Sequence, residues 1–512
     1  MKTKIRKQLA VRKRRMAKRL DKTTQGPESL TPGISATNIE YEIADRSRAI
    51  GAGGIGAMQQ MVKWLGLDRE INLHVNVLKL HLPYSESDHV QNIAFNLLAG
   101  GTCLEHLELR RNDEAYLDAL GAQRIPDPTT AGDFCRRFDP WKIHQLMEAV
   151  NNVRVKVWQQ QPDAFFDQAI IEADGTMVET YGECKQGTDF NHKGQYGYHP
   201  LVVTLANTKE VLYVVNRSGN RPSHEKAAGY FDRSIALCRR AGFRQIRLRG
   251  DTDFSQTEYL DGWDTDGVTF VFGYDATDNL YEAAECLELT DWKPLKRAPR
   301  YEVKTEPRGR RANVKEANVI RRNYKNIKLQ KEWVAEFSYR PTACNKDYRI
   351  VVVWKDLEER QGQQKLWDFT RCFFYITNDW SLTPEEVVFE ANQRCNQENV
   401  IQQDKSDVHA LTAPLDNLES NWAYMVIATL AWNLKAWSAL LLPISNRWKD
   451  RHTEEKSTLL RMDFSTFRHA MIHIPAQIVR KGRKLVYRLL GWNHWQSVFF
   501  RLLDRFRQPL RC

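Results

Sequence analysis

The sequence of 512 residues predicts a mixed α/β fold with a strand-rich middle between two helical regions. Three observations predict it. Apolar residues recur at helical spacing from about residue 43 to residue 160, short apolar runs bounded by turn residues begin at residue 165, and helical spacing returns from residue 383. Hydrophobic residues make up 42% of the chain and aromatic residues 11%, which excludes a disordered chain and is enough for two to four domains with their own cores.

Positive charge is concentrated at the two ends of the chain. The sequence has 75 Lys or Arg and 64 Asp or Glu, a formal net charge of +11. Residues 1–24 hold eleven basic side chains and one acid, and residues 480–512 hold nine basic side chains and one acid, so the remainder is slightly acidic. Basic ends of this kind favour nucleic acid or another anionic surface as partner. We expect residues 1–40 to be a flexible basic arm and linker, and residues 446–512 to be a basic helical C-terminal region.

The cysteines and the apolar stretches argue against a secreted or membrane protein. The nine cysteines occur singly, without a C-x-x-C pair, which is typical of reduced thiols and gives no zinc site. The basic N-terminus has no apolar segment like that of a signal peptide. The most apolar stretch, residues 422–444, contains Asn433, Lys435 and Pro443, which favours a buried helix over a membrane span. We therefore expect a cytoplasmic protein with no membrane partner.

The first half of the chain is expected to hold a helical domain and the start of the core. Residues 41–160 are expected to form a helical N-terminal domain for DNA binding or dimerisation, with simple helix packing as the alternative. Residues 161–274 are expected to form the first part of the core. Its predicted elements are a strand at 165–178, a hairpin of 201–205 with 211–215, a helix at 224–241, and strands at 244–249 and 268–272. This order of strands and helices predicts a mixed sheet of the ribonuclease-H kind.

A basic β-rich insertion is expected at residues 275–378, before the catalytic helix and the end of the core at residues 379–445. Within it, residues 293–331 carry fourteen Lys or Arg against three Glu, which favours a surface for the DNA backbone over an ordinary solvated loop. Trp333 and Trp354 are expected to pack in a core, with stacking on an extruded base as the alternative. The basic residues of this segment that we assign to DNA contact are Arg308, Arg310, Arg311, Arg321 and Arg322.

Two predicted strands end in carboxylates. Asp174 lies near the end of one apolar strand and Asp251 ends another. Glu172 shares a strand face with Asp174, and Asp253 shares one with Asp251, so each of them stays open as a rival ligand. A strand-end aspartate taken singly is usually a turn former.

A narrow stripe on the helix expected from residue 384 adds Arg394, Glu398 and Lys405. At about 100° per residue these three side chains point in nearly one direction. Two strand-end aspartates and one helical glutamate offer the oxygen ligands that Mg²⁺ or Mn²⁺ prefers, and two such ions can clamp a scissile phosphate. Arg394 and Lys405 would contact phosphate. An Arg–Glu pair four residues apart is usually a surface salt bridge, but the three acids together on this scaffold favour catalysis.

Four segments resemble the DDE transposases of bacterial insertion sequences, in the group 1 branch of the transposase DDE domain. They are EADGT at 172–176, NHKGQYGYHPL at 191–201, RGDTDF at 249–254 and NQRCNQEN at 392–399. The resemblance covers roughly residues 40–500. It implies a ribonuclease-H-like core with a β-rich insertion, and metal-dependent cut-and-paste transposition at the nucleoid of a bacterial cytoplasm. His199, in the second segment, is expected to be structural, with a place near DNA as the alternative.

The resemblance also assigns roles by position. It assigns the catalytic acids and the ligands of two Mg²⁺ or Mn²⁺ ions to Asp174, Asp251 and Glu398. Related cut-and-paste transposases carry a tyrosine–arginine–glutamate–lysine signature with two, three and six residues between successive members. Arg394, Glu398 and Lys405 fit this spacing, whereas Ala391 stands where the tyrosine would be. The departure removes a hydroxyl contact to phosphate and leaves the metal ligands in place.

The implied partner is double-stranded DNA, both the terminal inverted repeats of an element and the target. The implied reaction cleaves the DNA ends and joins their 3′ hydroxyls to the target, with a homodimer in the synaptic complex. Two alternatives stay open. One is a catalytically inactive transposase-derived DNA-binding protein, and the other is a ribonuclease-H-like nuclease without strand transfer.

Overall fold

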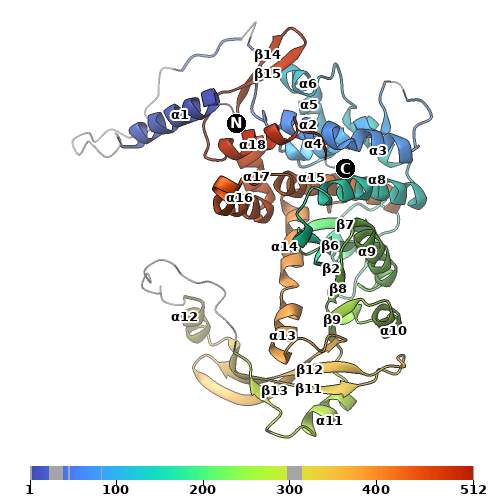
Figure 1. Cartoon of the computed structure of the whole chain (residues 1–512). Coiled ribbons are helices and arrows are strands. Elements are labelled where there is room, and N and C mark those ends of the chain that lie inside the picture. Colours follow the sequence, from blue (N-terminus) through green and yellow to red (C-terminus); the bar gives the residue numbers. More distant parts are fainter. Residues whose placement is uncertain (1–2, 22–38, 44–46, 82, 297–313, 511–512) are drawn as a thin grey trace. The chain divides into compact units, whose positions relative to one another are not determined.

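The computed structural model describes residues 3–21, 39–43, 47–81, 83–296 and 314–510 (Figure 1). The chain divides into two compact units. The sheet unit comprises residues 166–175 and 222–398, and the helical unit comprises residues 1–165, 176–221 and 399–512.

The sheet unit is built on a mixed sheet (Figure 1). Its parallel strands, side by side, are β2 (Gln168–Gly175), β8 (Gln245–Gly250) and β9 (Thr269–Tyr274). An antiparallel extension continues from β9 through β13 (Gln364–Thr377), β12 (Tyr348–Gln361), β11 (Lys325–Tyr339) and β10 (Lys293–Pro294). Parallel strands need crossover connections, and these include helices α9 (Ala227–Ala241) and α10 (Thr257–Thr265). Two further helices of this unit are α11 (Asp278–Glu285) and α12 (Val314–Arg321).

The register of the parallel strands aligns their carboxyl ends. Glu172 of β2 pairs with Arg249 of β8, and apolar neighbours such as Ile171 and Leu248 are fully buried. Runs of this kind are typical of parallel strands, which are covered on both faces. Residues that come just after the paired segment in each strand therefore meet at one edge of the sheet, where open α/β sheets place their ligands.

Helix α13 (Pro384–Asn392) covers part of this sheet. Thr383 and Glu386 form a capping box at its start, and Pro384 occupies the first helical position. One face of the helix enters an apolar cluster with the strands. The buried members of this cluster are Val271, Leu295, Val334, Val351, Val353, Val387, Val388 and Ala391.

The single helix expected from residue 384 to residue 405 is divided in two. Helix α13 ends at Asn392, two turn residues follow, and α14 (Cys395–Ser406) begins after them. The Asn392 side chain donates to the carbonyl of Val388 at 2.7 Å, and such local bonds compete with the helical ladder. Arg394 therefore lies at a turn between helices, and Glu398 lies in the first turn of α14.

The helical unit surrounds α15 (Leu418–Leu440), whose side chains are buried on nearly all sides. Helix α15 packs against α4, α7, α8, α16 and strand β7. Among the helices that the structure describes, none is long and apolar enough to cross a membrane. The other helices of this unit include α2 (Ile55–Leu65), α3 (Leu67–His74), α4 (Glu86–Leu98), α5 (Leu107–Arg111), α6 (Glu114–Leu120), α7 (Pro128–Cys135), α8 (Pro140–Trp158), α16 (Lys449–Arg461), α17 (Phe464–Phe467) and α18 (Gln496–Arg505).

The helical unit also carries short antiparallel pairings. Strands β6 (Leu201–Leu205) and β7 (Glu210–Val215) form the hairpin expected there. Two small sheets have the orders β3-β5-β4 and β1-β14-β15. Their strands are β3 (Val178–Glu179), β4 (Asp189–Phe190), β5 (Tyr196–Tyr198), β1 (Ala49–Ile50), β14 (Ala476–Lys481) and β15 (Lys484–Leu489). The chain thus has the predicted mixed α/β fold, and the core elements β2, β6, β7, α9, β8, α10 and β9 follow in ribonuclease-H-like order.

Two terminal regions differ from the expectations. Residues expected in a flexible arm form helix α1 (Thr3–Asp21), a stretch rich in helix-forming Lys, Arg, Leu, Ala and Met. The side chains of Ile5, Leu9 and Arg12 in α1 are half-buried. The C-terminal region is not wholly helical, because the β14–β15 hairpin lies within it.

Candidate active site

Asp174 and Asp251 lie at the carboxyl ends of neighbouring strands in the sheet unit. Asp174 is in the second-last position of β2, and Asp251 directly follows β8. Asp251 caps the short 3-10 helix η4 (Thr252–Phe254), because its Oδ1 accepts a hydrogen bond from the backbone N–H of Asp253 at 3.1 Å. The strand register and this cap fix the positions of the two carboxylates.

The guanidinium of Arg394 brings three acids together. Its Nη1 lies 3.6 Å from Asp174 Oδ2 and 3.5 Å from Asp251 Oδ2, and its Nη2 lies 3.4 Å from Glu398 Oε1. The three carboxylates that the sequence predicts as a set therefore converge on one cation, although they lie far apart in the chain. We call Asp174, Asp251, Glu398 and Arg394 the acid cluster.

Negative charge exceeds positive charge in the acid cluster. Burial raises the pKa of Asp174 to about 7, the nearby Asp251 carboxylate raises it further, and Arg394 opposes the shift. Burial also raises the pKa of Asp251, again against the effect of Arg394. The exposed fraction of the side chain increases from 16% in Asp174 to 34% in Asp251 and 55% in Glu398. The cluster therefore opens toward solvent on the side of Glu398.

The donor atoms of the acid cluster fit a hard divalent cation. All three acids offer carboxylate oxygens, which Mg²⁺ and Mn²⁺ prefer, and the repulsion that raises the pKa of Asp174 is the kind that a cation relieves. As the described side chains stand, however, no three acids, histidines or cysteines are arranged closely enough to hold a metal ion. Arg394 is the group that the three carboxylates surround.

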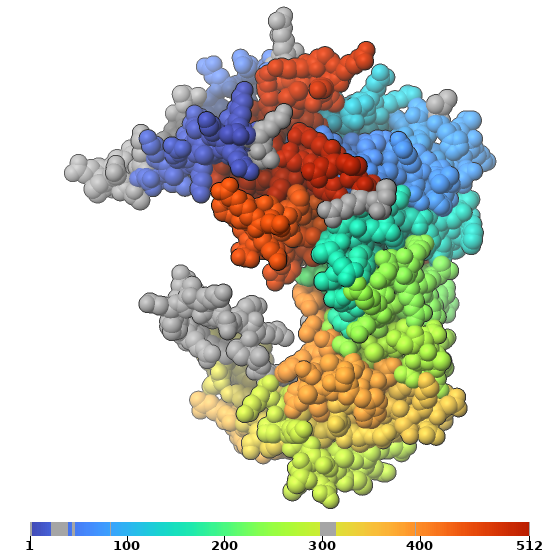
Figure 2. Space-filling model, viewed as in Figure 1, coloured from blue at the N-terminus to red at the C-terminus, as the bar shows by residue number. Residues whose placement is uncertain are grey.

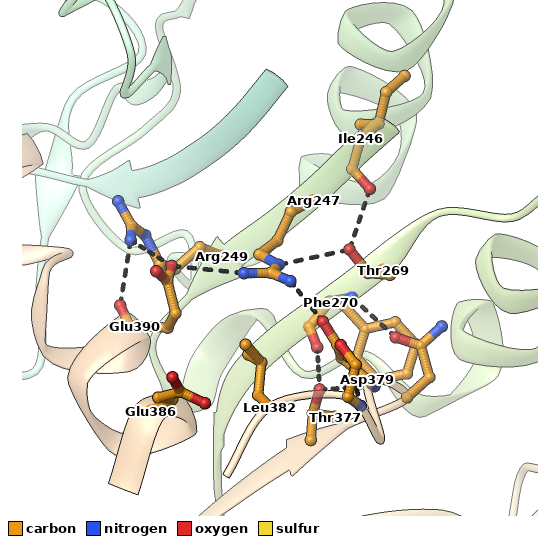
Figure 3. A network of polar contacts seen from close by, with 12 residues as sticks. Ile246, Arg247, Arg249, Thr269, Phe270, Thr377, Asp379, Leu382, Glu386 and Glu390 are labelled. Carbon is orange, nitrogen blue, oxygen red and sulfur yellow. Dashed lines mark hydrogen bonds and ion pairs between the residues drawn. The ribbon is translucent and has the colours of Figure 1, made fainter. Parts of the chain in front are cut away.

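A second set of charges lies on the same strands, one step further from their ends. The Arg249 Nη2 is 2.6 Å from Glu172 Oε1, and the Arg249 Nη1 is 3.0 Å from Glu390 Oε2 of α13 (Figure 3). Arg247 pairs with Asp379 and lies 3.8 Å from Glu390. We call these five residues the buried ion-pair network. It joins β8 to the helix that leads to Arg394.

The two rival acids occupy different places. Glu172 is buried and its carboxylate is held by Arg249 of the ion-pair network. Asp253 is exposed, and its backbone N–H bonds to Asp251. The ion pairs of Arg394 are made with Asp174 and Asp251. The geometry therefore favours Asp174 and Asp251 as the pair of strand-end acids.

The other predicted DNA contacts lie away from these ion pairs. Lys405 is on a later turn of α14, in the helical unit, where its Nζ donates to the carbonyl of Met177 at 2.5 Å. Arg321 and Arg322 are exposed at and after the end of α12, and Arg321 donates to Asn318 at 3.0 Å. Three further predicted residues, Arg308, Arg310 and Arg311, lie outside the described residues.

The aromatic and histidine candidates have packing contacts. Trp354 meets Trp292 edge to face at 5.4 Å and stands opposite Trp333 across β11 and β12. The Nδ1 of His199 donates to the carbonyl of Arg221 at 2.7 Å. These contacts agree with structural roles.

A pocket beside the acid cluster contains residues that the sequence did not single out. Asp251 and Arg394 line it together with Tyr274, Tyr281 and Arg371. Tyr281 meets Phe374 edge to face at 5.6 Å, so part of its wall is aromatic. The tyrosines follow β9 or lie on α11, and only the spatial arrangement of the strands places them near the catalytic candidates.

The comparisons with known proteins agree with this site. The family model described as "Transposase DDE domain group 1" matches residues 44–510. No curated protein matches the chain. Among solved structures, the chain is similar to the piggyBac transposase in the cryo-EM structure of its synaptic complex with hairpin DNA, with 10% identity, coverage of 90% of this chain and 83% of that one, and a TM-score of 0.36. Because the family match spans nearly the whole sequence, the chain belongs to the transposase DDE domain group 1 family.

Proposed function

We propose that this transposase binds the terminal inverted repeats of its own element, cleaves the DNA ends and joins the freed 3′ hydroxyls to target DNA. The observation that carries the proposal is the convergence of Asp174, Asp251 and Glu398 on Arg394. Each of these acids is an ordinary surface feature when taken alone. Their meeting at the ends of two strands is what a phosphoryl-transfer site requires.

The residues that would hold metal ions are Asp174, Asp251 and Glu398. Two divalent cations, Mg²⁺ or Mn²⁺, supply activation of the attacking oxygen and stabilisation of the leaving oxygen when bound. The excess of carboxylates over guanidinium groups in the acid cluster supports this assignment.

Arg394 is proposed to exchange partners when DNA binds. Its contacts of 3.4–3.6 Å are longer than the roughly 2.7–2.9 Å of strong charge-assisted hydrogen bonds, so leaving the carboxylates costs it little. A guanidinium can hold two phosphate oxygens at once, which orients the scissile group. Arg394 thus balances the acids without DNA and positions the phosphate with DNA. Lys405, Arg321 and Arg322, with Arg308, Arg310 and Arg311, are proposed to contact the DNA backbone elsewhere.

The tyrosine missing from the signature has a structural cause. Ala391 faces the apolar cluster under α13 and is buried, so its position on the helix points away from solvent. Tyr274 and Tyr281 line the pocket beside Arg394 instead. Burial raises the pKa of Tyr274 to about 12, so its hydroxyl keeps its proton and can donate to a phosphate oxygen.

The proposed setting follows from the family and from the two-ended substrate. Bringing two element ends together implies a homodimer on DNA. We propose a bacterial insertion sequence as the element, and the cytoplasm, at the nucleoid, as the place of action.

The test is a cleavage and joining assay on duplexes that carry the sequences flanking the gene, with Mg²⁺ or Mn²⁺. We expect strand breaks at the element ends and covalent joining of the 3′ ends to a target plasmid. The Glu398→Gln variant should lose both products while still binding the end duplex. Glu282→Gln, an exposed acid of α11 in the same unit, is the matched control and should keep both products.

The outcomes separate the alternatives. Breaks without joined products would indicate a nuclease without strand transfer. Specific binding without breaks in the wild-type protein would indicate an inactive DNA-binding relative. Cleavage that survives in the Glu398→Gln variant would remove Glu398 from the site.

A further inference from the structure

A basic hairpin projects from the helical unit. Strands β14 and β15 join through the two residues Gly482 and Arg483, and Gly482 has φ of +58°, which favours glycine. Each strand has six residues, so the ribbon is roughly 20 Å long. Figure 1 shows the two strands extending beyond the helices next to them, and Figure 2 shows their atoms standing out from the surface.

The hairpin has two chemically different faces. Side chains alternate along each strand, so paired residues share a face. The inner face carries Ala476 and Leu489, then Ile478 and Tyr487, then Arg480 and Leu485. The outer face carries Gln477 and Arg488, then Val479 and Val486, then Lys481 and Lys484 near the turn. Residues 480–488 contain five basic side chains and no acid.

The inner face fastens the hairpin to the unit. The Tyr487 hydroxyl donates to the carbonyl of Ala119, and its ring packs so closely on Gly56 that a side chain there would collide with it. Arg480 pairs with Asp118, which also binds Arg48. These contacts fix the base of the ribbon and leave the basic side chains near the turn exposed.

Helix α1 adds positive charge at the foot of the hairpin. The Nη1 of Arg12 donates to the carbonyls of Leu489 and Gly491 at 2.9 and 3.0 Å. Helix α1 carries nine Lys or Arg and one acid, Asp21, and most of its basic side chains are exposed. The hairpin and the helix are therefore joined through hydrogen bonds into one strongly basic region.

We infer that the outer face of the β14–β15 hairpin is a docking surface for double-stranded DNA, with the turn inserted in a groove. A two-stranded ribbon fits the major groove, and Arg and Lys side chains at its edges reach the phosphates on both sides. The outer face has no aromatic residue, and its Val479 and Val486 are half-buried, so it lacks the apolar anchors of a membrane-binding element. The inference rests on the proposed function for the identity of the partner and adds a contact surface in the helical unit.

The test compares two triple variants of the full-length protein. One is Lys481→Ser, Arg483→Ser and Lys484→Ser at the exposed turn. The matched control removes three scattered exposed basic groups of the same unit through Lys63→Ser, Arg69→Ser and Lys79→Ser. Binding to a random-sequence duplex and to the gene-flanking duplex is measured by fluorescence anisotropy in EDTA over a range of KCl concentrations.

We expect the turn variant to bind both duplexes about 10- to 100-fold more weakly near 0.1 M salt, and its slope of log K against log salt to shrink by about 2 to 3. The control variant should change the slope by less than about 1. Unchanged affinity and slope in a turn variant with wild-type circular dichroism would overturn the inference. Loss of binding to phosphatidylserine vesicles, with DNA binding intact, would overturn it as well. Since EDTA removes catalysis from the measurement, failure of the proposed cleavage reaction would appear separately, in the assay with metal.

Discussion

The acid cluster and the buried ion-pair network use the same strands for opposite ends. In the network, Glu172 and Arg249 are almost wholly buried, and their oxygen and nitrogen atoms lie 2.6 Å apart. In the acid cluster, three carboxylates share one guanidinium at 3.4–3.6 Å and are open to solvent to differing degrees. Short, buried and matched pairs hold β8 to α13. Longer pairs with too few cations leave charge that a substrate or metal ion can use.

The largest expected effect is on catalysis. Asp251→Asn should lower the single-turnover cleavage rate about 1000-fold, which is about 4 kcal/mol, because a ligand of the proposed metal site loses its charge. Asp253→Asn, two residues away and outside the ion pairs of Arg394, should lower the rate less than about 10-fold. If the Asp253 variant were the slower of the two, the second acid of the site would be Asp253.

The next effect is on stability and contrasts two arginines. Arg249→Met should lower the free energy of unfolding by about 3–5 kcal/mol, because it leaves Glu172 buried without its partner. Arg394→Met should lower it by less than about 1 kcal/mol, as for other loose, partly exposed ion pairs. Urea unfolding followed by tryptophan fluorescence measures both.

The double variant Glu172→Leu with Arg249→Met is the control for that contrast. It should recover much of the lost stability, because no unpaired charge stays buried. Equal losses in the Arg249 and Arg394 variants would break the distinction between the network and the acid cluster.

A buried histidine of the helical unit gives a smaller, pH-dependent effect. His89 stacks on Phe134 with ring centroids 4.4 Å apart, and burial lowers its pKa to about 4. Unfolded chains bind the proton near pH 6.5, so between pH 6.5 and about 4 the unfolded state takes up more protons than the folded state. Stability is therefore full above pH 6.5 and falls on the order of 2 kcal/mol as the pH drops to 4.

His89→Phe, which can keep the ring stack, removes this titration. Its unfolding free energy should depend less on pH in that window than that of the wild type. An unchanged pH profile would show that His89 is protonated in the folded protein at the ordinary pH for histidine.

The smallest effect tests whether the acid cluster stores repulsion. In metal-free buffer at pH 8, Asp174→Asn should raise the free energy of unfolding by on the order of 1 kcal/mol, because a charge that burial and Asp251 disfavour is gone. Glu172→Gln is the matched change in the network and should lower it, because an ion pair with Arg249 is lost. Equal signs for the two variants would contradict the comparison.

Much of the fold and the acid cluster could be predicted because it depends on local pattern. Apolar runs that end in Asp174 and Asp251 predict strands with acids at one edge, and the spacing of Arg394 and Glu398 depends only on helical geometry. The helix break at Arg394 was not predicted, because it depends on a side-chain bond from Asn392 to the backbone.

Other features depend on register and tertiary packing. The pairing of Glu172 with Arg249 follows from the alignment of β2 with β8, although each residue stands two positions before a predicted catalytic aspartate. The β14–β15 hairpin was expected to be helical. The signal that could have found it is Gly482 between basic residues, flanked by alternating apolar side chains.

The most direct measurement is a crystal structure of the protein with Mn²⁺, with the ion located by its anomalous scattering. We predict a manganese peak between the carboxylates of Asp174 and Asp251, with the guanidinium of Arg394 displaced toward solvent or toward a phosphate. A peak elsewhere, with Arg394 still among the three acids while the same preparation cleaves DNA, would contradict the assignment of the active site.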